Sequence, residues 1–184
     1  MQYQQLGHTG LDVSIVSLGT APLGDMFGKA EHRDVEQIVA KALQAGINFF
    51  DTSPYYGDGL AETRLGAALR RHRDEVLIGT KAGRYGTDRF DFTPRRIRAS
   101  LEESLHRLRT DHVDIFQLHD IEFVELGPVL TDSYAELVRL RDQGKCRFIG
   151  MTGYPTAALG RAIEQTDLDV VLSYGHSTLL DTCL

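Results

Sequence analysis

Residues 47–83, INFFDTSPYYGDGLAETRLGAALRRHRDEVLIGTKAG, decide the fold of this chain. The apolar run over 47–51 predicts a buried strand, and a turn rich in proline and glycine follows it. Leu65 and Leu69 stand at helical spacing, and residues 76–80 predict a second buried strand. A strand, a helix and a strand of this length form a βαβ unit, whose right-handed crossover makes the two strands parallel.

The same alternation continues on both sides of this unit. The strand starts near 47, 76, 113, 147 and 170 are 23 to 37 residues apart, which is the size of one βα unit. Predicted strands cover 16–19, 47–51, 76–80, 113–118, 147–150 and 170–174. Predicted helices cover 35–43, 65–69, 94–108, 134–141 and 157–164, and the third has Thr93 as N-cap and Pro94 at its first position. A β-hairpin, Tyr3 to Leu6 and Val13 to Ile15, precedes them.

Two parallel architectures compete for this pattern. An open doubly wound sheet normally has a GxGxxG turn after its first strand, and VSLGTAPLGD (16–25) lacks that spacing. A (β/α)8 barrel of the TIM type places polar functional residues at the carboxyl ends of its strands, as found here. We therefore expect a single barrel domain over 1–184 with an N-terminal β-hairpin, truncated after about six strands. Two open sheet edges would leave it prone to instability or aggregation unless a partner completes it.

Composition narrows the function classes. The chain has 42% hydrophobic and 25% charged residues and a net charge of −6, which disfavours nucleic acids and membrane surfaces as partners. No basic and apolar leader and no apolar run of about 18 residues is found, so a cytoplasmic location is expected. Cys146 and Cys183 have no paired spacing, which argues against a disulfide framework or a thiolate zinc site. The oligomeric state has no sequence signal.

Four polar residues follow three successive predicted strands. Asp51 and Tyr56 follow the strand in INFFDTSPYYG, Lys81 ends the strand in EVLIGTKAG, and His119 follows the strand in VDIFQLHD. A Lys81 ammonium would stabilise a Tyr56 phenolate and lower the pKa of the phenol, while Asp51 would hold the lysine. His119 would orient a substrate oxygen toward Tyr56. Such a site moves a proton while a cofactor moves a hydride, and it needs no metal.

Each of these residues also has a purely structural interpretation. Asp51 would be a turn or cap residue, Tyr56 a loop anchor, Lys81 a solvated side chain and His119 a hydrogen-bonded structural residue. Their occurrence together on three consecutive strand ends favours the catalytic interpretation.

The motifs around these residues resemble the aldo-keto reductase family. FFDTSPYYGDGLAETRLGAALR (49–70) is similar to its signature segment, and IGTKAG, FQLHD and CRFIGMTG follow in the family's order. The resemblance implies a (β/α)8 barrel closed at one end by the hairpin, with Tyr56 as acid/base, Asp51 and Lys81 tuning it, and His119 orienting the substrate. HDIEF, GMTGYP and VVLSYGHSTLLD resemble the aldose dehydrogenase branch.

The resemblance also implies a cofactor, NAD or NADP. Its implied contacts are Thr20, Asp51, Thr152 and Ser173. Many relatives carry Ser-Asn after the fifth strand, where both side chains bind the nicotinamide amide, and this chain has Thr152-Gly153 there. The alternative for Thr20 and Thr152 is a hydroxyl that caps local backbone.

The expected function is oxidation of an aldose of the L-galactose, L-fucose or D-threo-aldose type at C1 to the lactone, with the small sugar or another aldehyde or alcohol as substrate. The alternative is a catalytically inactive truncated homologue, or a non-enzymatic binding subunit with the same fold.

Overall fold

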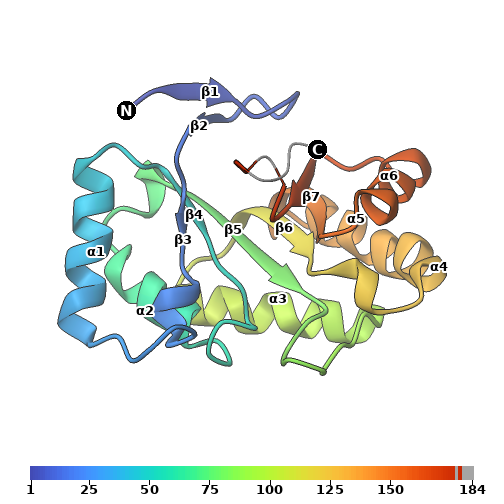
Figure 1. The fold of residues 1–184 in the computed structure, drawn as a ribbon, viewed down its shortest axis with the longest axis horizontal. Helices are drawn as coiled ribbons and strands as arrows, with labels where there is room; N and C mark the ends of the chain where they lie inside the picture. Colours follow the sequence, from blue (N-terminus) through green and yellow to red (C-terminus); the bar gives the residue numbers. More distant parts are fainter. Residues whose placement is uncertain (177, 180–184) are drawn as a thin grey trace.

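A curved sheet of parallel strands, with helices around its outer side, forms the body of the protein (Figure 1). The computed structural model describes residues 1–176 and 178–179. Cys183 lies outside these residues, and so does part of the VVLSYGHSTLLD motif. Six strands pair in chain order, β3-β4-β5-β6-β7-β8, and every neighbouring pair is parallel. The strands are β3 (Leu18–Gly19), β4 (Phe49–Asp51), β5 (Leu77–Ala82), β6 (Val113–Leu118), β7 (Cys146–Gly153) and β8 (Val170–Ser173).

This arrangement confirms the predicted barrel architecture with six strands in the described part of the chain, and it excludes the doubly wound sheet, whose strand order is not sequential. The main helices are α1 (His32–Gln44), α2 (Leu60–Ala68), α3 (Pro94–Leu108), α5 (Tyr134–Asp142) and α6 (Thr156–Gln165). They follow one another around the outside of the strands (Figure 1). No helix in residues 1–176 is long and apolar enough to cross a membrane.

The predicted N-terminal hairpin forms between β1 (Tyr3–Gln5) and β2 (Asp12–Ser14), paired antiparallel. The Tyr3 hydroxyl donates to the Gly46 carbonyl at 2.8 Å, and the Ser14 N–H donates to Asn48 Oδ1 at 2.8 Å. Both acceptors precede β4, so the hairpin is tied to the N-terminal end of the sheet. The opposite end, where the carboxyl ends of the strands gather, stays open for a functional site.

The core lies between the sheet and the helices. All six residues of β6 are buried, as expected for a strand covered on both faces. The predicted apolar stripe of α3 is buried in the core cluster, and Thr93 caps this helix by accepting the Arg96 N–H at 3.4 Å. Burial of each such leucine or isoleucine side chain stabilises the fold by about 1.5–3 kcal/mol. The stripe consists of Ile97, Leu101, Leu105 and Leu108.

The predicted helix over 134–141 is confirmed as α5, but further helical turns that were not predicted precede it. Helical turns at α4 (Leu126–Pro128) and a π-helical turn at Val129–Ser133 precede α5 without a break. Gly127 and Pro128 act as helix breakers in a sequence pattern, but proline is tolerated in a first helical turn. The Ser133 hydroxyl donates to the Phe92 carbonyl at 2.6 Å, a contact across 41 residues that sequence spacing does not show.

Candidate active site

The structure brings the four predicted catalytic residues to one end of the sheet. Asp51 is the last residue of β4, Lys81 lies near the end of β5, and His119 directly follows β6. Because these three strands are adjacent and parallel, their carboxyl ends lie side by side. Tyr56 stands in the turn after β4, and its ring centroid is 5.9 Å from that of His119.

Lys81 and Asp51 form a buried ion pair. The Lys81 ammonium donates to Asp51 Oδ1 and Oδ2 at 2.7 and 2.6 Å and to the Thr52 carbonyl at 2.9 Å. An ammonium has three N–H donors, and these three acceptors match that number. Burial alone would lower the pKa of Lys81, but the Asp51 carboxylate and the Tyr56 phenol outweigh it, so the pKa is raised and the lysine is charged.

Tyr56 has a different acidity from the one expected. The Lys81 ammonium lies 5.2 Å from the centroid of its ring and lowers the pKa of the phenol, which is the predicted direction. Burial is the larger influence, and the Asp51 carboxylate acts in the same sense as burial, so the pKa of Tyr56 is raised overall. Tyr56 is therefore a neutral phenol at pH 7. The expectation of a lowered pKa was wrong because a sequence does not show how deeply the phenol is buried.

His119 is almost fully enclosed. Its Nδ1 lies 2.9 Å from the Ser53 hydroxyl oxygen, and its Nε2 lies 3.6 Å from Asp120 Oδ2. Burial lowers the pKa of His119 well below its ordinary value, and the positive charges of Lys81 and Arg84 add to this effect. The imidazole is therefore neutral at physiological pH and can donate one N–H hydrogen bond.

Two polar residues beside His119, Asp120 and Arg84, are absent from the sequence prediction, and both belong to a network that includes the predicted Thr152. Asp120 has a left-handed backbone conformation, with φ 55°, which is uncommon outside glycine. The Thr152 hydroxyl accepts the Asp120 N–H at 2.9 Å and donates to Asp120 Oδ1 at 3.1 Å. Arg84 pairs with the same carboxylate through Oδ2, and its guanidinium lies 4.2 Å from the centroid of the Tyr55 ring. The sequence signals for these residues were the Asp in LHD and the Arg in TKAGRY.

The predicted cofactor contacts divide into two groups. Thr20 Oγ1 and Ser173 Oγ are buried and have no hydrogen-bond partner within the described residues. The same is true of Gln117 Oε1, which the sequence prediction did not include. Buried polar atoms without a partner are rare in proteins, so these atoms fit a site that a polar ligand completes. The Thr152 hydroxyl, in contrast, uses its only proton on Asp120. Asp51 is already engaged by Lys81.

The glycine at position 153, where the resemblance implies asparagine in many relatives, has a local explanation. A Cβ atom at this position would lie 2.8 Å from Glu122 Oε2, so the Glu122 carboxylate takes the space of a side chain. Glu122 Oε1 accepts hydrogen bonds from the Tyr154 N–H at 2.9 Å and from the Tyr174 hydroxyl at 3.2 Å. The glycine at position 153 therefore leaves space that the Glu122 side chain occupies.

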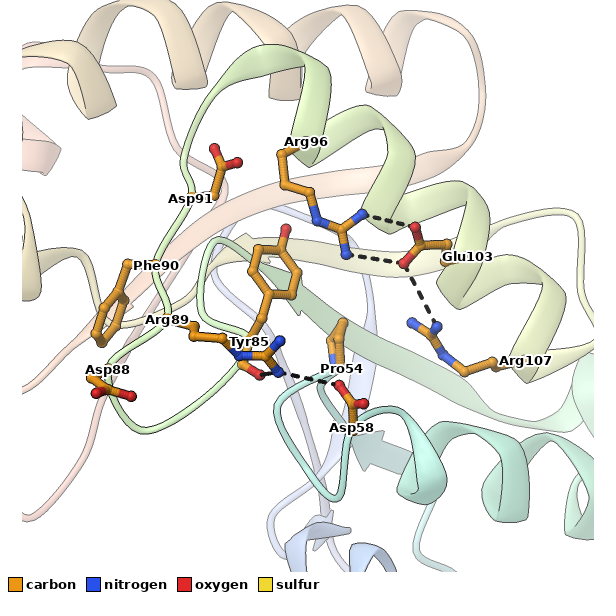
Figure 2. A pocket seen from close by; sticks show the side chains of 10 residues that line it. All are labelled: Pro54, Asp58, Tyr85, Asp88, Arg89, Phe90, Asp91, Arg96, Glu103 and Arg107. Atoms are coloured by element: carbon orange, nitrogen blue, oxygen red, sulfur yellow. Dashed lines mark hydrogen bonds and ion pairs between the residues drawn. The ribbon is translucent and has the colours of Figure 1, made fainter.

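A polar cavity of about 410 Å³ lies beside this site, between the loop after β5 and helix α3 (Figure 2). Its arginines are matched by carboxylates: Arg96 pairs with Glu103 at 2.8 Å, and Arg89 reaches Asp58 at 3.5 Å. None of the four predicted catalytic residues lines it. Across the described residues there is also no cluster of three or more His, Cys, Asp or Glu side chains suited to a metal ion.

Comparison with known proteins assigns the class of protein. Residues 16–182 match the model of the aldo/keto reductase family, and the chain belongs to this family. It is 46% identical to L-galactose dehydrogenase of Arabidopsis thaliana and 35% identical to D-threo-aldose 1-dehydrogenase of a Pseudomonas species, and the alignments cover 98% and 94% of the chain. Within the family, these similarities confirm the aldose dehydrogenase branch. The chain spans about 60% of the length of both relatives.

Solved structures agree with this assignment. The aldo-keto reductase AKR11C1 from Bacillus halodurans, in its holo form, superimposes with a TM-score of 0.83 at 25% identity and covers 94% of the chain. The glycerol dehydrogenase AKR11B4 from Gluconobacter oxydans gives a TM-score of 0.77 at 29% identity. The chain spans 57% and 54% of these two proteins, respectively. The curved six-stranded sheet is therefore part of the TIM-type barrel that the sequence predicted.

Proposed function

We propose that this chain carries the proton-transfer site of an NAD(P)-dependent oxidoreductase that oxidises an aldose at C1 to the lactone. The observation that supports the proposal most strongly is the convergence of Tyr56, the Lys81–Asp51 ion pair and a neutral His119 at one end of the sheet. The sugar class, of the L-galactose, L-fucose or D-threo-aldose type, follows from the similarity to L-galactose dehydrogenase and D-threo-aldose 1-dehydrogenase.

In the oxidation, the His119 imidazole donates a hydrogen bond to the C1 hydroxyl oxygen and holds it next to Tyr56. Tyr56, as the tyrosinate, takes the hydroxyl proton, and the Lys81 ammonium stabilises that tyrosinate. Asp51 holds Lys81 in its position and keeps it charged. A bound nicotinamide would accept the hydride that leaves C1. In the reverse reduction, the Tyr56 phenol returns the proton to the oxygen.

The residues that would hold the nicotinamide carboxamide are those with unused hydrogen-bonding capacity. Thr20 and Ser173 offer free hydroxyls, and Gln117, the β-sheet neighbour of Lys81, offers a free carbonyl oxygen. Thr152 keeps one oxygen lone pair for a donor, because its proton is used by Asp120. Titration calorimetry with each nucleotide would decide between NAD and NADP.

Replacement of Tyr56 by phenylalanine tests the proposed role. Loss of the acid/base is expected to lower aldose oxidation by roughly 10²- to 10⁴-fold, with the thermal midpoint nearly unchanged. Tyr134→Phe is the matched control, because it removes a phenol hydroxyl on the outer helix α5 and is expected to keep the full rate. A Tyr56→Phe protein that keeps its rate would contradict the proposal.

The alternative, a homologue that binds without catalysis, makes a different prediction. Two results from a folded wild-type chain would support it: no binding of NAD⁺ or NADP⁺ in the calorimeter, and no increase in the absorbance of reduced nicotinamide with a panel of aldoses. Nucleotide binding together with turnover of one aldose would exclude it.

A further inference from the structure

Ser53 contacts the Nδ1 atom of His119, whereas Asp120 lies nearest to the other ring nitrogen, Nε2. Its hydroxyl oxygen lies 2.9 Å from His119 Nδ1, and the side chain is completely buried. The same oxygen accepts a hydrogen bond from the Tyr55 N–H at 3.1 Å. Ser53 itself is held in place by the anchored turn after β4, where the Thr52 N–H donates to the Gly79 carbonyl at 2.8 Å. The contact therefore joins two rigid strand ends.

The direction of this hydrogen bond follows from the number of donors and acceptors. A serine hydroxyl has one proton to donate, and a buried polar proton without an acceptor is costly, by about 1–3 kcal/mol. Within the described residues, the hydrogen bonds of Ser53 Oγ are those with Tyr55 and His119. Since the Tyr55 N–H already donates to this oxygen, His119 Nδ1 is the acceptor left for the Ser53 proton. Nδ1 then carries no proton of its own.

The surroundings of the other ring nitrogen, Nε2, independently indicate that the proton is on Nε2. Nε2 lies 3.6 Å from Asp120 Oδ2, a carboxylate oxygen that can only accept hydrogen bonds when ionised. Arg84 forms an ion pair with the same carboxylate. A proton on Nε2 is attracted by this negative charge, whereas a bare Nε2 lone pair would be repelled. Both neighbours of the ring favour the Nε2–H form.

We propose that Ser53 is a positioning residue, which donates to His119 Nδ1 and so holds the imidazole in the tautomer with its proton on Nε2. This inference rests on the proposed function for its meaning: Nε2–H is the group that donates to the oxygen on C1 of the substrate. With the opposite tautomer, Nε2 would present a lone pair to that oxygen and could not orient an unprotonated carbonyl in the reduction. Ser53 touches neither the reacting atoms nor the hydride, and it acts through His119.

The tautomer is measured directly by two-bond ¹⁵N–¹H correlation NMR on the full chain labelled with ¹⁵N-histidine, without nucleotide or sugar. The His119 signals are assigned from their loss in a His119→Gln variant. In the wild type we expect Nδ1 to resonate as an unprotonated nitrogen and Nε2 as a protonated one. In Ser53→Ala we expect the Nδ1–H form to appear and the kcat for aldose oxidation to fall roughly tenfold.

Thr52→Val is the matched control. The Thr52 hydroxyl is also buried at this strand end, but it has no hydrogen-bond partner among the described residues, so its loss should leave the His119 signals unchanged. A wild-type protein with its proton on Nδ1 would overturn the inference. So would a Ser53→Ala protein with wild-type His119 signals, or a Thr52→Val protein with the same tautomer change. Absence of aldose oxidation in the wild type would overturn the proposed function and leave the tautomer result standing.

Discussion

Lys81 is hydrogen-bonded to Asp51 and lies beside Tyr56. Its ammonium donates to both Asp51 oxygens, at 2.7 and 2.6 Å, and lies 5.2 Å from the centroid of the Tyr56 ring. The Lys81 side chain is 2% exposed and that of Asp51 15% exposed, so the pair is shielded from water. Burial is the main cause of the raised pKa of Tyr56, and the Asp51 carboxylate opposes the lowering effect of the Lys81 ammonium, so the phenol stays protonated at neutral pH.

The ion pair predicts a strong coupling between its members. Asp51→Asn and Lys81→Met should each lower the free energy of unfolding by about 3–5 kcal/mol, because each leaves one buried charge without its partner. The double variant should lose clearly less than the sum of the two losses. Urea unfolding of all four proteins measures the coupling.

Asp58→Asn provides the control for this cycle. Asp58 is 88% exposed and meets Arg89 at 3.5 Å, so its replacement should change stability by less than about 1 kcal/mol. Strictly additive losses for Asp51 and Lys81 would show that the two side chains do not stabilise each other.

The raised pKa of Tyr56 predicts the pH dependence of the proposed oxidation. The tyrosinate is the base, so a pKa above the ordinary 10 leaves a small active fraction at pH 7 that grows about tenfold per pH unit. The kcat for aldose oxidation should therefore rise continuously from pH 7 to pH 9. The reverse reduction uses the protonated phenol and should be nearly flat over this range. An oxidation rate that levels off near pH 7 would contradict the raised pKa.

Glu62, the glutamate of the signature segment, has a structural role in the described fold. It is fully buried, accepts from the Thr80 hydroxyl at 2.5 Å, and pairs with Arg107 Nε at 2.6 Å, so it joins α2 to β5 and α3. Glu62→Gln should cost about 2–4 kcal/mol of stability, since the Arg107 charge loses its buried partner. Glu103→Gln, at the half-exposed carboxylate that pairs with Arg96 in Figure 2, should cost less than about 1 kcal/mol. Equal losses in urea unfolding would contradict this assignment.

The strands and the catalytic cluster were predictable because both rest on local sequence and one topological rule. Continuous apolar runs such as 113–118 mark strands buried on both faces, and adjacent parallel strands bring their carboxyl ends together. The proximity of Asp51, Lys81 and His119 follows from that rule alone. The helix predicted over 134–141 matches α5, whereas the helical turns before it were not predicted because they include Gly127 and Pro128.

The polar residues around His119 were not predictable in the same way. Ser53 meets His119 across 66 residues, and Thr152 meets Asp120 across 32 residues, with no periodicity that connects them. The net acidity of Tyr56 depends on burial, which a one-dimensional pattern does not contain. Thr152 shows the consequence: its hydroxyl accepts the N–H of Asp120, which is distant in the sequence, and not the local backbone that the sequence had offered as the alternative to a cofactor contact.

Cys146, the first residue of β7, predicts a loss of stability in alkaline solution. Burial is the main influence on this thiol and raises its pKa from 9.0 to about 12. Between these values the unfolded chain releases the thiol proton while the folded chain retains it, so the free energy of unfolding falls as pH rises above about 9. The slope for this one group approaches about 1.4 kcal/mol per pH unit. Urea unfolding at pH 8, 9 and 10 should show a smaller decline for Cys146→Ala than for the wild type. Cys183 is present in both proteins, so their difference isolates Cys146, and parallel declines would mean that its thiol ionises as readily in the folded state as in the unfolded state.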